Sequence, residues 1–153
     1  MANTYTQIYI QYVFAVQNRI SLIKNEWKDE LYKYMTGIFN QHEHKLLSIG
    51  GMPDHVHALV SMHPRQAPSD LMYEIKRSSS IWINQKHLVM GKFSWQEGFG
   101  AFSYGQSQIS QVSKYIENQE THHKKMIFRE EYLDFLKAFN IEYDERYIYK
   151  EIE

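Results

Sequence analysis

Two histidines separated by a single residue are the first candidates for chemistry in this sequence. His55 and His57 stand in GGMPDHVHALVSM, residues 50–62, which otherwise has the apolar character of a buried strand. Side chains alternate across a strand, so both imidazoles project from one face, about 7 Å apart along the chain. Neutral imidazole is the commonest metal ligand, and such a pair can converge on one cation. Two polar side chains on a solvated face are the alternative interpretation.

A second set of polar side chains follows about 60 residues later, in QVSKYIENQETHHKK, residues 111–125. Tyr115 and Gln119 are four residues apart, so they share one face of a helix. A tyrosine can act as a covalent nucleophile, and an amide oxygen is a hard ligand that suits Mg²⁺ or Mn²⁺. The spacing also allows His122 or His123 to be the third ligand. The alternative is that this helix face simply packs in a core.

Strands are needed to position the histidine pair, and the pattern of the chain predicts four. Period-2 alternation over QIYIQYVFAV, residues 7–16, predicts the first. HKLLSIG (44–50) and HVHALVSM (55–62) predict the next two, which the GMPD turn joins into a hairpin. A short aromatic strand is the candidate within WQEGFGAFSYG (95–105).

Helices are predicted where apolar residues recur at helical spacing. Asn25 is a plausible cap for the first helix, and Ser69 for the second. A long helical stretch begins near Ser107 and runs at least to His123, and a further helix covers residues 129–139.

The order β-α-β-β-α-β, followed by helices, predicts an α+β fold of the ferredoxin-like, RRM-like type with additional C-terminal helices. In this arrangement the first and third strands lie side by side in the middle of an antiparallel sheet. Two crossover helices cover one sheet face, over the apolar set that starts at Val56. The other face is expected to be open and to carry the histidines. We expect a single domain, residues 1–153, with an acidic tail at about 140–153.

Composition sets limits on the class of protein. Lys and Arg number 17 against 18 for Asp and Glu, a net charge of −1 that does not by itself indicate a nucleic-acid partner. The tail has five acidic and two basic residues, which leaves the rest mildly basic. The chain has no cysteine, so thiol nucleophiles and cysteine metal sites are excluded. No membrane-spanning stretch and no signal-peptide pattern are present, so we expect a cytoplasmic protein.

The combination of motifs resembles a known family. His55-Val56-His57 matches the histidine–hydrophobic–histidine (HUH) signature, and Tyr115 with Gln119 matches its single-tyrosine companion. With GGMPDHVHALV leading, the chain is similar over nearly its whole length to the IS200/IS605-type single-tyrosine (Y1) transposases. The resemblance implies a homodimer that cuts and rejoins single-stranded DNA, usually beside small imperfect hairpins.

The same resemblance implies roles for individual residues. Tyr115 would attack a DNA phosphorus and form a 5′-phosphotyrosine, and a 3′-hydroxyl would later reverse that linkage. His55, His57 and Gln119 would hold a divalent metal, Mg²⁺ or Mn²⁺. In the family the tyrosine helix commonly serves the histidine pair of the partner subunit. The sequence leaves open whether the active site forms within one chain or between two.

Basic side chains near these motifs are predicted, as a group, to contact phosphates. They are Lys76, Arg77, Lys114, Lys124 and Lys125.

Three other functions stay open on the sequence alone. One is a non-cleaving, ferredoxin-like nucleic-acid-binding module or domesticated REP-type relative that uses the open sheet face. A second is a host-recruited enzyme that acts on repeated chromosomal palindromes and keeps the same active site. The third is a metal-dependent phosphodiesterase with a water nucleophile. It would need more carboxylate ligands near the histidines, and Asp54 is the obvious one.

Overall fold

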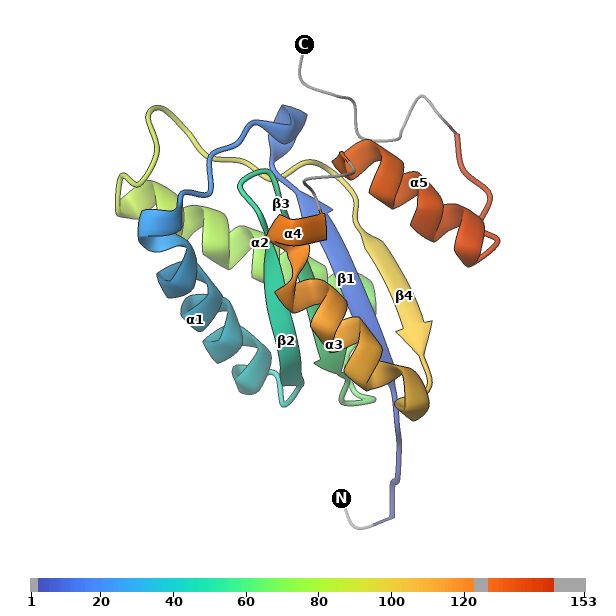
Figure 1. The fold of residues 1–153 in the computed structure, drawn as a ribbon. Helices are drawn as coiled ribbons and strands as arrows, with labels where there is room; N and C mark the ends of the chain where they lie inside the picture. The colour runs from blue at the N-terminus through green and yellow to red at the C-terminus, as the bar shows by residue number, and fades with distance from the viewer. Residues whose placement is uncertain (1–2, 123–126, 145–153) are drawn as a thin grey trace.

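A computed structural model describes residues 3–122 and 127–144 of the chain. It has four strands and helices on both sheet faces (Figure 1). The strands are β1 (Tyr9–Ala15), β2 (Lys45–Met52), β3 (His55–Ser61) and β4 (Gly100–Tyr104). The helices are α1 (Asn25–Gln41), α2 (Pro68–Gln85), α3 (Ile109–Glu117), α4 (Gln119–His122) and α5 (Phe128–Ala138), with 3₁₀ turns η1 (Gln17–Arg19) and η2 (Gln106–Gln108).

The sheet has the strand order β2-β3-β1-β4, and each neighbouring pair is antiparallel. The first and third strands are therefore central, which confirms the predicted ferredoxin-like arrangement. In the β1–β3 register, Val13 pairs with His57 and Ala15 pairs with His55. The histidines thus stand at the start of β3, beside the end of β1.

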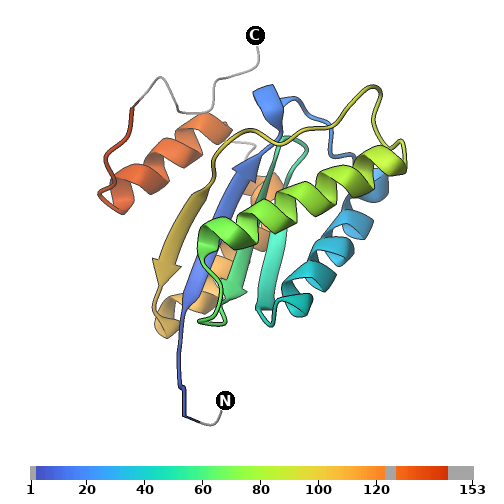
Figure 2. The same ribbon diagram turned by 180° about the vertical axis from the view of Figure 1, so that it is seen from behind.

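The main hydrophobic core lies between the sheet and the two crossover helices, α1 and α2 (Figure 2). Alternate residues of β1 and β3 enter it, as the period-2 pattern predicts. Tyr12 and Phe14 come from β1, and Val56, Ala58 and Val60 come from β3. The apolar residues of β3 therefore face the helices, which leaves His55 and His57 for the opposite face.

That opposite face is not open, which corrects the expectation from the sequence. In Figure 1, α3 and α4 cross the face over β2, and α5 lies beside β1 and β4. Both faces of β1 are apolar, since Val13 and Ala15 alternate with its core residues, and a sheet with two apolar faces must be covered on both. The second cluster contains Val13, Ala15, Phe102, Phe128, Tyr132 and Leu136.

The helix boundaries correct three predictions. Asn25 and Ser69 lie inside the first turns of α1 and α2, and the residues that precede these helices are Lys24 and Ala67, neither with a side-chain capping hydrogen bond. The predicted long helix is interrupted, because Asn118 ends α3 and separates it from the short α4. The last helix forms where its periodicity indicates.

Part of the predicted acidic tail lies outside the described residues, which end at position 144. The single-domain interpretation of residues 1–153 stays a prediction. None of the described helices combines the length and the apolar character needed to cross a bilayer.

Gly50 on β2 lets α3 approach the sheet closely. A Cβ atom built there would clash with the backbone carbonyl oxygen of Ile116 on α3. Because a backbone atom cannot move aside alone, Gly50→Ala should push α3 away and lower the free energy of unfolding by about 1–3 kcal/mol. Urea titration measures the change.

Gly37 on α1 supplies the matched control for this substitution. Apart from the local backbone of α1 itself, no heavy atom lies within 4 Å of a Cβ built there. Gly37→Ala should leave the protein at least as stable as the native chain, since alanine is the better helix former. A Gly50→Ala protein that unfolds at the same urea concentration as the native chain would contradict the close packing of α3.

Candidate active site

The two imidazoles of the HUH pair are fully buried, and the Nδ1 atom of each is hydrogen-bonded to a polar side chain. His55 Nδ1 lies 2.7 Å from Asp54 Oδ1, and His57 Nδ1 lies 2.7 Å from Gln11 Oε1. A carboxylate oxygen and an amide oxygen only accept hydrogen bonds, so each Nδ1 carries the hydrogen and donates it. In the neutral rings the Nε2 atoms then carry lone pairs, and these point into the site.

Two further side chains bring oxygen atoms to the same point. Gln119 Oε1 lies 3.3 Å from His55 Nε2. Glu131 Oε1, from α5, lies 3.0 Å from His57 Nε2 and 3.6 Å from His55 Nε2. The amide nitrogen of Gln119 lies 3.4 Å from both the Tyr115 carbonyl oxygen and Glu131 Oε2, which orients its oxygen toward the histidines.

This donor set fits a divalent cation. Two imidazole nitrogens, one amide oxygen and one carboxylate oxygen converge, and lone pairs 3.0 Å apart require a proton or a cation between them. Ligands in adjacent positions around an octahedral Mg²⁺ lie about 3.0 Å apart. Ligand atoms of His55, His57 and Glu131 all lie within 4.8 Å of one another. The buried group is therefore consistent with divalent-metal binding.

Tyr115 reaches the same cluster from α3. Its hydroxyl donates a hydrogen bond to Glu131 Oε2. Its ring meets that of His57 edge to face, with the centroids 5.8 Å apart. Burial raises the pKa of the phenol well above its usual value near 10, and the charge and hydrogen bond of Glu131 raise this pKa further, while Gln119 lowers it. One chain thus brings the predicted nucleophile beside the predicted ligands.

Glu131 and Gln11 are the members of the cluster that the sequence interpretation missed. Glu131 lies in the amphipathic stretch REEYLDFLKAF, where acidic residues suggest a solvated helix start. It is instead 2 % exposed, and a buried carboxylate needs charged or hydrogen-bonding partners. Gln11 is a polar residue within an otherwise apolar strand, and this signal was available in the sequence.

The alternative third ligands are not placed. The side chain of His122 and the whole of His123 lie outside the described residues. Gln119 is 1 % exposed and lies in the cluster, so it remains our prediction for the third ligand.

The predicted phosphate contacts fall on different parts of the molecule. Lys76 lies on α2, on the sheet face opposite the histidines. Its ammonium donates to the carbonyl oxygens of Gln96 and Gly98, and burial lowers its pKa to about 8. Arg77 is exposed on the same helix, and Lys114 is exposed on α3 beside Tyr115. Lys124 and Lys125 lie outside the described residues. DNA contact by this group stays a prediction.

Replacing Glu131 with alanine should weaken Mn²⁺ binding by roughly tenfold to a hundredfold. The substitution removes the anionic oxygen nearest to His57 Nε2 and leaves only neutral donors in the described cluster. Titration followed by electron paramagnetic resonance of free Mn²⁺ measures the affinity. Glu130→Ala is the matched control, because Glu130 is the exposed neighbour on the same helix. Equal affinities in the two variants would show that Glu131 is not a ligand.

The family described as "Transposase IS200 like" matches residues 4–119, a span that includes the histidine pair, Tyr115 and Gln119. A curated relative, the ISDra2 transposase TnpA of Deinococcus radiodurans, is 26 % identical over 118 residues, which are 74 % of this chain and 84 % of the relative. The family match ends before α5, so Glu131 lies beyond it.

Two solved structures share the fold. A transposase structure from Deinococcus radiodurans superposes with a TM-score of 0.58 at 22 % identity, over 76 % of this chain and 94 % of the other. A REP-associated tyrosine transposase, solved bound to a REP hairpin, gives 0.61 at 14 % identity, over 79 % and 72 %. The match of the family over most of the chain decides the assignment: the chain belongs to the IS200-like transposases, the enzyme class that its motifs resemble.

Proposed function

We propose that the protein cleaves and rejoins single-stranded DNA through a covalent 5′-phosphotyrosine on Tyr115, at sites flanked by hairpins. The observation that carries this proposal is the convergence of the Tyr115 hydroxyl with His57 and Glu131 in one buried cluster. A protein that only binds DNA has no need of a phenol beside a set of metal ligands.

The chemistry is a transesterification at phosphorus. The Tyr115 oxygen forms a bond to phosphorus, and the bond from phosphorus to the 3′-oxygen of the preceding nucleotide breaks. That 3′-oxygen takes up a proton, while the phenol has an acceptor for its own proton in Glu131 Oε2. A 3′-hydroxyl from another strand can reverse the step, so rejoining needs no external energy source.

The residues that would hold the metal are His55, His57 and Gln119, to which the structure adds Glu131 as a candidate. When bound, a divalent ion such as Mg²⁺ or Mn²⁺ supplies Lewis-acid polarisation of the phosphate and neutralises its charge. Asp54 and Gln11 keep the Nε2 atoms of the two histidines directed into the site by accepting their Nδ1 hydrogens.

The DNA partner is inferred from the family and from a structural neighbour that was solved bound to a REP hairpin. The cytoplasmic location stays a prediction from the sequence. The homodimer stays a prediction from the resemblance. In the structure of one chain, Tyr115 already lies beside its own His57.

The test is formation of a covalent adduct with a labelled single-stranded hairpin oligonucleotide in the presence of Mn²⁺. Attack by Tyr115 keeps the fragment on the 3′ side attached to the protein. A 3′ label should therefore migrate with the protein on a denaturing gel, and a 5′ label should appear in a shorter free oligonucleotide. Chelation of the metal should prevent both. Binding without either product would favour the non-cleaving alternative.

A further inference from the structure

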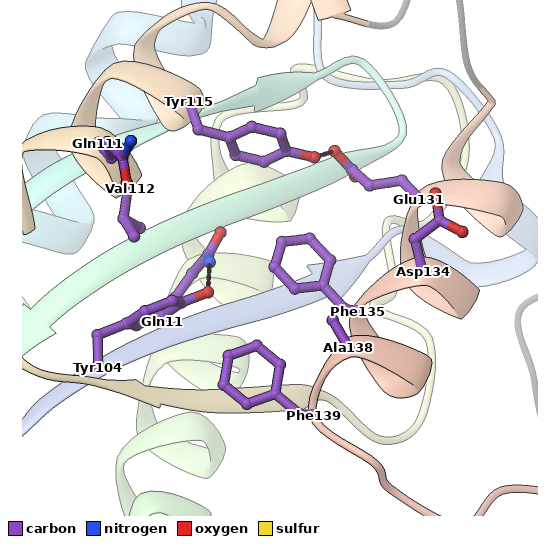
Figure 3. A pocket seen from close by; sticks show the side chains of 10 residues that line it. All are labelled: Gln11, Tyr104, Gln111, Val112, Tyr115, Glu131, Asp134, Phe135, Ala138 and Phe139. Atoms are coloured by element: carbon purple, nitrogen blue, oxygen red, sulfur yellow. Dashed lines mark hydrogen bonds between the residues drawn. The ribbon is translucent and has the colours of Figure 1, made fainter. Parts of the chain in front are cut away.

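We propose that a cavity beside Tyr115 binds one unpaired nucleobase, that of the nucleotide on the 3′ side of the scissile phosphate. This inference rests on the proposed function and adds a substrate contact to it. The cavity has a volume of about 420 Å³ and lies between α3 and α5, over β1 and β4 (Figure 3). Its walls include Tyr104, Val112, Tyr115, Phe135, Ala138 and Phe139.

The walls suit a flat, conjugated group. Figure 3 shows the rings of Phe135 and Phe139 projecting into the cavity from α5, opposite Tyr104 and Gln11. The Phe135 ring is supported from behind by stacking on Phe102, with centroids 4.9 Å apart, and Phe139 meets Tyr104 edge to face. Rigid aromatic faces of this kind bind bases by stacking, and they accept any base because every base has a π-face.

Two polar side chains of the cavity wall, Gln11 and Tyr104, are oriented by hydrogen bonds. Gln11 Nε2 donates to the Tyr104 hydroxyl at 2.8 Å, and Gln11 Oε1 accepts from His57. A hydroxyl that accepts one hydrogen bond can still donate its own hydrogen. Tyr104 can therefore donate to a carbonyl or ring nitrogen of a base, and Gln11 connects this contact to the HUH pair.

The position of Tyr115 identifies the nucleotide that reaches the cavity. In an in-line displacement the attacking and leaving oxygens lie on opposite sides of phosphorus. The nucleoside on the 5′ side therefore leaves in the direction away from Tyr115. The nucleoside on the 3′ side stays joined to the same phosphorus next to Tyr115, which is itself part of the cavity wall.

A base in this cavity cannot be paired. It must leave the helical stack to enter a pocket between two protein helices, and this is least unfavourable when the DNA is already single-stranded. The cavity therefore supplies a physical reason why the substrate is single-stranded, which the cleavage chemistry by itself does not supply.

The first experiment removes the base that is proposed to enter the cavity. The substrate is a 3′-labelled hairpin oligonucleotide whose cleavage position has been mapped, made either intact or with an abasic nucleotide on the 3′ or the 5′ side of that position. In the native protein, the 3′ abasic nucleotide should slow adduct formation by about tenfold or more, and the 5′ one should slow it less. Equal rates for the intact and the 3′ abasic oligonucleotides would overturn the inference.

Two substitutions on α5 test the cavity itself. Ala138→Phe fills it from an exposed position, and Lys137→Phe places the same ring on the exposed neighbour that does not line it. Ala138→Phe should slow cleavage of the intact oligonucleotide and bring the rates for the intact and 3′ abasic oligonucleotides to within about twofold of each other. Lys137→Phe should keep the difference between these two rates that the native protein shows. A native difference between the two rates in Ala138→Phe would place the base elsewhere and overturn the inference.

A binding measurement separates this inference from the proposed chemistry. With 2-aminopurine on the 3′ side of the mapped position, binding to the Tyr115→Phe protein should quench the fluorescence by stacking, and Ala138→Phe in the same background should restore it. Unchanged fluorescence would overturn the cavity proposal even where the adduct forms normally. Failure of every oligonucleotide to form an adduct with the native protein would overturn the proposed function, and the inference with it.

Discussion

Replacing Tyr115 with phenylalanine should reduce formation of the protein–DNA adduct by roughly a thousandfold or more, because the substitution removes the oxygen that attacks phosphorus. The ring that remains can keep the edge-to-face contacts of Tyr115 with His57 and Phe135. The affinity for the uncleaved oligonucleotide should therefore stay within about twofold of the native value. Denaturing gels measure the adduct, and fluorescence anisotropy measures binding.

Tyr73→Phe provides the control for loss of a phenol. Tyr73 is exposed on α2, behind the sheet and away from the cluster. Its adduct yield should equal that of the native protein. An adduct that persists at a native rate in Tyr115→Phe would show that another nucleophile carries the reaction, and it would refute the assignment of Tyr115.

Replacing His57 with alanine should lower the cleavage rate by about a hundredfold or more at a limiting Mn²⁺ concentration. His57 supplies a buried Nε2 atom 3.0 Å from Glu131 Oε1, and the alanine variant lacks this ligand. If the loss arises through the metal, raising the Mn²⁺ concentration should recover part of the rate. The measurement is the cleavage rate as a function of metal concentration at saturating DNA.

His63→Ala is the matched control for this second variant. His63 follows the far end of β3, where its Nε2 lies 3.4 Å from Glu43 Oε2. Its metal dependence should be native. Because His57 is fully buried, thermal melting must first show that His57→Ala is folded. A folded His57→Ala protein with native activity at low metal would argue against a ligand role.

Local patterns in the sequence were sufficient to predict the strands of the sheet and the relative placement of four side chains, those of His55, His57, Tyr115 and Gln119. Period-2 alternation places Val56, Ala58 and Val60 on one face of β3 and both histidines on the other, and the structure confirms this. The reason is geometric, since the side-chain period of a strand is independent of what packs on it. The four-residue spacing likewise brings Tyr115 and Gln119 together, although a break after α3 lies between them.

The cover over the histidine face was decided by tertiary packing. The apolar stripe of α5 indicated a helix but not its partner surface, because amphipathicity is a property of one element and docking is a property of two. Val13, Ala15 and Phe102 provide that surface and bring α5 over β1 and β4. The face expected to be open is consequently closed around the site.

Glu131 shows most clearly the difference between what local patterns predict and what tertiary packing decides. By its sequence it is one of several acidic residues at the start of a helix, and it stands 74 positions from His57. Only the docking of α5 turns its carboxylate inward, where two imidazoles and a phenol compensate for its burial. The residue types and spacings thus determined the strands, the sheet face that carries the histidine pair, and the nearness of Tyr115 to Gln119. The packing of distant segments decided which further charge joins them, because the stability of a buried charge depends on neighbours that no local pattern specifies.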